Sequence, residues 1–90
     1  MIKQQPHPKS LGERLNLYRT RINMSRKELA ELIGVTPSTI RNYENDITEP
    51  DINRLYVIAD ALGVTISMLM HGREPERETE PLIISGNPQI

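Results

Sequence analysis

Polar side chains recur at helical spacing between residues 38 and 45. Ser38, Arg41, Asn42 and Asn45 stand at positions i, i+3, i+4 and i+7, which places them on one face of an α-helix. Each of these side chains can donate a hydrogen bond. Arginine can pair with guanine O6 and N7, and asparagine with adenine N6 and N7, so the pattern is typical of a helix in the major groove of DNA. It also fits an ordinary solvated helix face, and this feature alone leaves both interpretations open.

The helix that would carry these residues has a clear start signal. Thr36 can act as its N-cap, and Pro37 suits the first helical position because no backbone N–H is missed there. Its inward face should hold Ile40 and Tyr43, followed by Ile47 as the chain leaves the helix.

Four further windows show apolar residues at helical spacing. Ser10 and Ser25 each stand three residues before a glutamate, which predicts a capping box at both helix starts. The stripe that follows Ser10 should extend to Ile22. Three residues, beginning with Gly34, separate the second and third helices, and so short a turn fixes their crossing angle. The four windows cover residues 10–22, 25–33, 51–62 and 65–70. Because residues 9–71 show no strand pattern, the sequence predicts an all-α fold of five helices.

Both ends of the chain differ from this helical body. Residues 1–8 contain two prolines and should form a flexible arm, which makes residues 9–72 the folded domain. Residues 73–90 begin as a charged, proline-containing linker. After the linker comes a short apolar segment, which could be a strand or a frayed tail: Leu82, Ile83 and Ile84.

Composition argues against several classes of protein. The chain has no cysteine, no apolar stretch long enough to cross a membrane and no apolar leader, so we expect a cytoplasmic protein that associates with the nucleoid when bound to DNA. His7 and His71 should lie outside the helical body, and neither belongs to a metal-spaced cluster. We therefore expect no catalytic residue, metal, cofactor or small-molecule ligand, and no enzymatic activity. The net charge of -1 neither supports nor opposes binding to nucleic acid.

The order of caps and core residues resembles a known family. The run from Ser25 to Asn45, SRKELAELIGVTPSTIRNYEN, is similar to the helix-turn-helix of the Cro/lambda-repressor-like, or XRE, family. The run from Pro50 to Met70 looks like the fourth and fifth helices of that family. The resemblance covers about residues 10–71 and implies a five-helix lambda-repressor-like DNA-binding domain. Its second and third helices would form the helix-turn-helix.

The resemblance also implies roles for single residues. Base-reading positions of the family correspond here to Pro37, Ser38, Arg41 and Asn42. Positions that hold phosphates correspond to Arg26, Thr39 and Asn45, although Thr39 could serve helix packing alone and Asn45 the helix C-terminus. A salt bridge of the family corresponds to Arg19 and Glu44. Tyr18 and Tyr43 are expected to be core residues rather than stacking platforms for bases.

The chain departs from the family at two places. Arg26 stands where relatives usually have glutamine; it can reach a phosphate but cannot accept a hydrogen bond, which puts its role in steadying the reading helix in doubt. After the third helix, relatives commonly carry glycine and basic residues, whereas this chain has Asp46 and Glu49. Two acids there should repel the DNA backbone. Lys3 and Lys9 could compensate, or they could simply be solvated.

Proteins of this kind usually dimerise on two half-sites of duplex DNA. Apolar residues left over from the core stripes are candidates for a homodimer interface: Tyr56, Val57, Met68, Leu82, Ile83 and Ile84. The sequence predicts a repressor that binds a palindromic operator. An alternative is an antitoxin-like or adaptor protein whose C-terminal segment binds a protein partner.

Overall fold

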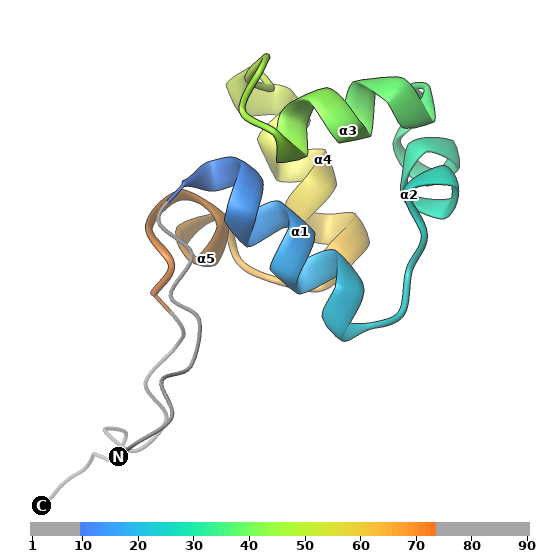
Figure 1. Cartoon of the computed structure of the whole chain (residues 1–90). Helices are drawn as coiled ribbons and strands as arrows, with labels where there is room; N and C mark the ends of the chain where they lie inside the picture. The colour runs from blue at the N-terminus through green and yellow to red at the C-terminus, as the bar shows by residue number, and fades with distance from the viewer. Residues whose placement is uncertain (1–9, 74–90) are drawn as a thin grey trace, which may run out of the picture.

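The computed structural model describes residues 10–73 and contains five helices and no strand within that range (Figure 1). The helices are α1 (Leu11–Arg21), α2 (Arg26–Ile33), α3 (Pro37–Glu44), α4 (Ile52–Leu62) and α5 (Ile66–His71). The predicted all-α fold is confirmed. The predictions for residues 1–8 and 74–90, the segment of Leu82, Ile83 and Ile84 included, lie outside the described residues.

Each helix begins at a residue whose side chain accepts a hydrogen bond from the third helical backbone N–H. These N-caps are Ser10, Ser25, Thr36, Asp51 and Thr65. An N-cap satisfies one of the backbone donors that the first helical turn leaves without a partner. The predicted capping box at Ser25 is complete, because Glu28 also accepts a hydrogen bond from the Ser25 backbone N–H. Local sequence therefore sets where each helix starts.

Two helix ends differ from the prediction. α1 ends at Arg21, and Ile22 follows it as a non-helical C-cap that is 47% exposed, so its expected place in the apolar stripe was wrong. Asn23 then turns the chain with a φ of +58°. At α5, His71 is the last helical residue rather than a residue outside the helical body. Its helix continues to that point because the N–H of Gly72 bonds to the carbonyl of Met68.

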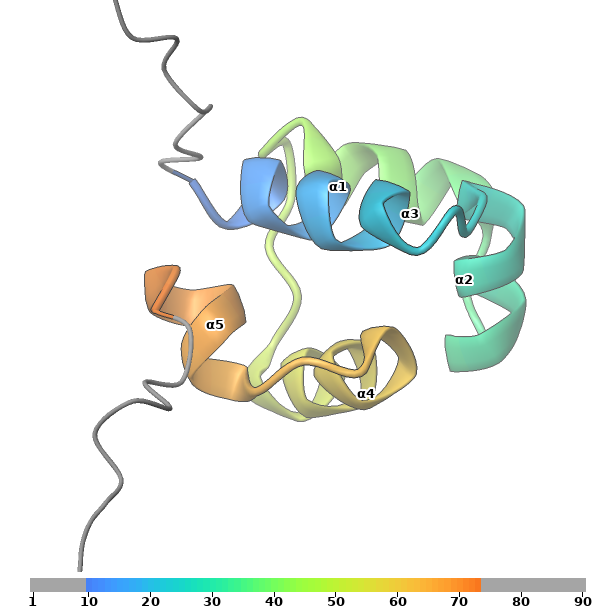
Figure 2. The ribbon, with the colours of Figure 1, turned by 90° about the horizontal axis from the view of Figure 1, so that it is seen from below.

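The core receives one fully buried large side chain from every helix. These side chains are Leu15, Leu29, Ile40, Ile58 and Leu69. Burying an aliphatic side chain of this size stabilises a fold by about 1.5–3 kcal/mol. Figure 2 shows α1 and α3 side by side on one side of the molecule, α4 and α5 on the other, and α2 closing one end. Tyr18 is buried among these residues, in agreement with its predicted core role.

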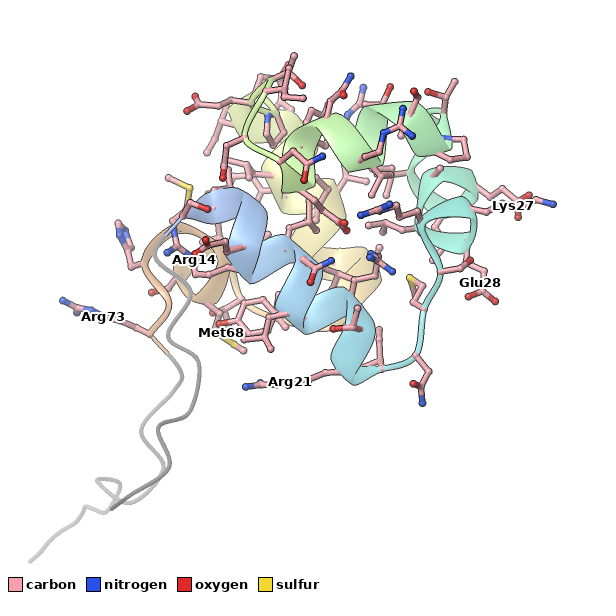
Figure 3. The ribbon with its side chains drawn as sticks, in the orientation of Figure 1. Arg14, Arg21, Lys27, Glu28, Met68 and Arg73 are labelled. Atoms are coloured by element: carbon pink, nitrogen blue, oxygen red, sulfur yellow. The ribbon has the colours of Figure 1, made fainter. Side chains whose placement is uncertain are left out.

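α1 is held to the end of α5 by a buried arginine that the sequence did not single out. The Arg14 guanidinium donates from Nε to the carbonyl of Leu69 and from Nη2 to the carbonyl of Met70 (Figure 3). These carbonyls belong to the last turn of α5, where the helix itself supplies no donor. Arg14 therefore holds α1 against α5. None of the five helices between residues 10 and 73 has the length and apolar character needed to cross a membrane.

Candidate nucleic-acid interface

The connection between α2 and α3 is a tight turn. Gly34 has a φ of +79°, a left-handed conformation that glycine adopts without steric cost. The backbone N–H groups of Gly34 and Val35 both bond to the carbonyl of Ala30, at 2.8 and 2.9 Å. Thr36 then caps α3 by accepting a hydrogen bond from the N–H of Thr39 at 3.2 Å. Both ends of the turn are bonded to helices, so α2 fixes where α3 begins.

The outward face of α3 carries the polar side chains that the spacing predicted. Pro37, Ser38, Arg41 and Asn45 are exposed, and Asn42 is half-buried. Arg41 Nη2 lies 3.3 Å from Ser38 Oγ, so these two side chains meet on the same face, one turn apart. The part of the outward face formed by these five residues contains no carboxylate. Four of the five side chains, all except that of Pro37, can donate hydrogen bonds to a molecule bound against this face.

Two of the predicted phosphate-binding residues also have roles within α3. Thr39 is half-buried, and its Oγ1 lies 3.0 Å from the Oγ1 of the cap residue Thr36. Asn45 is the C-cap of α3, and its backbone N–H bonds to the carbonyl of Arg41 at 3.0 Å. Asn45 is nevertheless an exposed residue.

The inward face of α3 is fixed by packing and by a buried carboxylate. Ile40 is fully buried, and Tyr43 packs against the core as a half-buried residue. Ile47, expected to point inward after the helix, is instead 66% exposed. The preceding residue, Asp46, has a φ of +59°, and this left-handed residue turns the chain away from the helical periodicity.

Glu44, the last residue of α3, is bonded to both α1 and α2. The two carboxylate oxygens accept hydrogen bonds from Arg19 Nε at 2.5 Å and Arg19 Nη2 at 3.1 Å. Asn16 Nδ2 donates at 3.1 Å, and Arg26 Nε donates at 2.9 Å. The Glu44 side chain is 1% exposed, and that of Arg19 is 9% exposed. The ion pair between α1 and α3 is therefore a buried one, bonded at both carboxylate oxygens.

The pKa of Glu44 reflects the balance between burial and these donors. Burial raises the pKa of this carboxyl, but the hydrogen bonds from Arg19, Asn16 and Arg26, together with the charge of Arg19, lower it below its ordinary value. Glu44 is therefore ionised at neutral pH. Its charge holds two arginines from two different helices against the end of α3.

Arg26 steadies α3 by a route that the sequence left in doubt. Although arginine cannot accept a hydrogen bond, Arg26 donates one from Nε to Glu44 and so links the first residue of α2 to the last residue of α3. Its side chain is 40% exposed, so this positively charged group is also open to solvent beside the start of α2.

Asp46 has a role that the sequence analysis missed. Its Oδ1 accepts a hydrogen bond from the backbone N–H of Gly12 at 3.0 Å, and its Oδ2 accepts one from the hydroxyl of Ser10 at 2.7 Å. The carboxylate of Asp46 is therefore bonded to the start of α1, in addition to carrying the negative charge that is expected to repel the DNA backbone. The sequence held a signal for the turn alone, since aspartate adopts a left-handed conformation more readily than most residues other than glycine.

The candidate dimer residues within the described part of the chain differ in exposure. Tyr56 and Val57 on α4 are 57% and 45% exposed. Met68 is half-buried and packs against the core, and its Sδ accepts a hydrogen bond from the N–H of Thr65 at 3.5 Å (Figure 3). Met68 thus has an internal role that its sequence position did not indicate.

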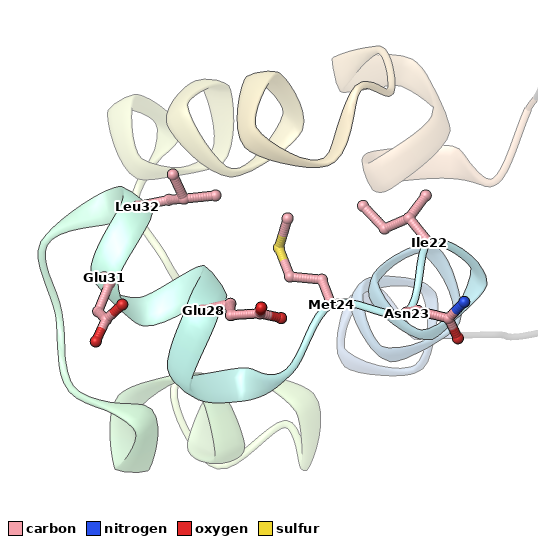
Figure 4. A pocket seen from close by; sticks show the side chains of 6 residues that line it. All are labelled: Ile22, Asn23, Met24, Glu28, Glu31 and Leu32. Carbon is pink, nitrogen blue, oxygen red and sulfur yellow. The ribbon is translucent and has the colours of Figure 1, made fainter.

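An open pocket of about 470 Å³ lies between the end of α1 and α2 (Figure 4). It is lined by Ile22, Asn23, Met24, Glu28, Glu31 and Leu32. The Met24 side chain lies between those of Ile22 and Leu32, which stand on opposite sides of it. None of the lining residues belongs to α3, so the pocket is separate from the polar face. Within residues 10–73, no group of three His, Cys, Asp or Glu side chains could hold a metal ion.

Comparisons with known proteins point to one kind of domain. A family model described as helix-turn-helix (HTH_3) matches residues 15–69. An uncharacterised HTH-type transcriptional regulator of Rickettsia prowazekii (strain Madrid E) is 32% identical over 72 residues, which are 80% of this chain and 55% of the relative. The chain thus spans little more than half the length of that relative.

Solved structures show the same arrangement of helices. The P22 c2 repressor in complex with a synthetic operator is similar with a TM-score of 0.69 and 26% identity, covering 73% of this chain and 100% of the repressor chain. SinR, a master regulator for biofilm formation solved in complex with DNA, is similar with a TM-score of 0.61 and 33% identity, covering 66% of this chain and 95% of the SinR chain.

Proposed function

Because the chain belongs to the helix-turn-helix family whose model matches residues 15–69, we propose that it binds double-stranded DNA sequence-specifically and regulates transcription. The predicted resemblance to Cro/lambda-repressor-like, XRE-type regulators is confirmed by this match and by the similarity to the P22 c2 repressor. In this proposal the chain acts by occupying DNA as a repressor and catalyses no reaction.

The observation that carries the proposal is the contrast between the two faces of α3. The inward face is fixed by Ile40 in the core and by Glu44 between two arginines. The outward face presents Ser38, Arg41 and Asn42 without competing acidic groups. A binding site needs side chains whose supporting elements are rigid, because base edges are distinguished by the direction of each hydrogen bond. We assign base reading to this face, with Pro37 allowing close approach at its start.

Phosphate binding would place the domain on the duplex. Arg26 supports this step, because its partly exposed cation lies in the first turn of α2, where the helix dipole also favours an anion. Thr39 and Asn45 are assigned to phosphates at the two ends of α3. Contacts of this kind set register and orientation but carry no sequence information.

A homodimer on a palindromic operator would supply the remaining specificity. One helix-turn-helix contacts few base pairs, so two copies reading half-sites about one helical turn apart would lengthen the recognised sequence. We assign this contact to Tyr56 and Val57, two of the exposed apolar residues of α4. Met68, a half-buried residue of α5, is assigned to the same contact. Leu82, Ile83 and Ile84 remain further candidates.

Selection of binding sites from random duplex DNA with the full chain tests this proposal. We expect enrichment of a palindrome whose half-sites lie about 10–10.5 base pairs apart, centre to centre. Competition between the enriched duplex and a scrambled duplex of the same composition then measures specificity at fixed salt. The proposal would be rejected if the folded protein preferred no duplex, even at low ionic strength where binding to DNA is strongest.

A further inference from the structure

The end of α3 is tied to the start of α1 through one side chain. Asp46 follows α3 by two residues and adopts a left-handed backbone conformation, with a φ of +59°. Its carboxylate bonds to the N–H of Gly12 at 3.0 Å and to the hydroxyl of Ser10 at 2.7 Å. We call these two hydrogen bonds the Asp46–α1 contact.

The chemistry of a helix start explains why a carboxylate binds there. The first backbone N–H groups of α1 have no partner within the helix, and the helix dipole is positive at this end. The Ser10 hydroxyl accepts a hydrogen bond from the N–H of Glu13 at 3.0 Å and donates its own proton to Asp46. Asp46 therefore completes the cap of α1 from a distant part of the chain.

The backbone is unusually close at this point. A Cβ added at Gly12 would lie 2.5 Å from the carbonyl oxygens of Tyr43 and Glu44 and 2.7 Å from Asp46 Oδ1. The first turn of α1 thus packs directly on the last carbonyls of α3, and the Asp46–α1 contact lies at that junction. A shift of α3 along α1 would break these hydrogen bonds.

We propose that Asp46 is a positioning residue that fixes the C-terminal end of α3, and with it the direction in which the outward face of α3 meets DNA. This inference rests on the proposed function. Glu44 holds the same end of α3 from its inward side through Arg19 and Arg26, whereas Asp46 bonds the turn after α3 to the first turn of α1. The two anchors therefore join the end of α3 to different parts of the domain.

Two variants of equal net charge separate the effect of the Asp46–α1 contact from the effect of the negative charge of Asp46. Asp46→Asn keeps an oxygen that can accept from Gly12 and an amide that can donate to Ser10 Oγ, and asparagine tolerates a positive φ. Asp46→Gly adopts the backbone conformation freely but removes both hydrogen bonds. Both variants remove one negative charge near the DNA, so both should bind scrambled duplex at least as tightly as the original chain.

The readout is the ratio of the affinities for the enriched and the scrambled duplex. This ratio is insensitive to simple loss of stability, because a smaller folded fraction lowers both affinities equally. We expect Asp46→Asn to stay within about twofold of the original ratio and Asp46→Gly to fall by about fivefold, the equivalent of one net hydrogen bond. Asp51→Ala is the control; it removes one charge and the N-cap of α4, and it should leave the ratio unchanged.

Amide hydrogen exchange, measured on the protein without DNA, tests the positioning role of Asp46 separately from DNA recognition. In Asp46→Gly, the amides of Gly12 and of Asn45, which closes the last turn of α3, should exchange faster than in Asp46→Asn. Equal ratios for the two variants, or unchanged exchange at Asn45, would overturn the positioning role. Absence of any duplex preference in the original chain would instead reject the proposed function, and the exchange data would still decide whether Asp46 fixes α3.

Discussion

At the scale of single residues, Glu44 is the group on which the orientation of α3 depends most. Its carboxylate receives four hydrogen bonds from Asn16, Arg19 and Arg26 while its side chain is 1% exposed. Removing one partner of such a buried pair typically costs about 3–5 kcal/mol, because the remaining charge stays buried without compensation. The resemblance to a family indicated the Arg19 partner. It did not indicate Arg26, whose link to Glu44 requires that α2 and the end of α3 already be adjacent.

Acidification should reveal the buried charge of Glu44. Its pKa is lowered in the folded state from an ordinary value of 4.5, so the unfolded chain takes up the proton at higher pH than the folded one. The stability contributed by this group is therefore complete above about pH 4.5 and is lost as the pH falls through the folded pKa. Urea unfolding between neutral pH and about pH 3 should show a steeper decline for the original chain than for Glu44→Gln.

Arg26→Met provides a second check in a variant that keeps the buried carboxylate. Loss of one hydrogen-bond donor leaves the pKa of Glu44 closer to its ordinary value, so the decline should be smaller than in the original chain and should end at higher pH. If all three proteins lost stability in parallel, Glu44 would not titrate differently in the folded and unfolded states, and its role as a buried anchor would be contradicted.

At the scale of helices, the starts could be predicted and some of the contacts between helices could not. Ser25 and Thr36 begin α2 and α3 as expected, because capping depends on residues only a few positions apart. Ile22 and Ile47 were placed inward because periodicity was extended past the true helix ends, where Asn23 and Asp46 turn the chain. The contact between Asp46 and Gly12 joins residues 34 positions apart, so no local pattern indicates it.

The junction of α1 and α3 predicts an unusual response to alanine. Gly12→Ala should favour an isolated helix by about 1 kcal/mol. Here the new Cβ would lie 2.5 Å from two backbone carbonyl oxygens of α3, so the helices must separate. We expect a net loss of about 1–3 kcal/mol in the free energy of unfolding, typical of overpacking.

Asn53→Ala is a matched control for this substitution, because Asn53 is exposed at the same second helical position in α4. Its effect should stay within about 0.5 kcal/mol, as for most surface substitutions. Chemical denaturation of both variants measures the difference. A Gly12→Ala variant as stable as the original chain would show that α1 and α3 do not need this close approach.

At the scale of the whole molecule, charge position matters more than charge total. The net charge of -1 gives no general attraction to nucleic acid. The net charge does not reveal three local features: the polar face of α3, the cation of Arg26 and the bonded carboxylate of Asp46. The sequence predicted the polar face through its helical spacing, but the rigidity of its support becomes visible only when α1, α2 and α3 are assembled.

The measurement that tests the central claim most directly compares Arg41→Ala with Lys27→Ala on the enriched duplex and on versions with single base substitutions. Both variants lose one positive charge, but Lys27 lies on α2 and points away from the molecule in Figure 3. We expect Arg41→Ala to lose about 1–3 kcal/mol on the enriched duplex and to become indifferent to one base position, while Lys27→Ala keeps the original base preferences. If Arg41→Ala weakened binding equally on every duplex and kept all base preferences, the outward face of α3 would not read bases.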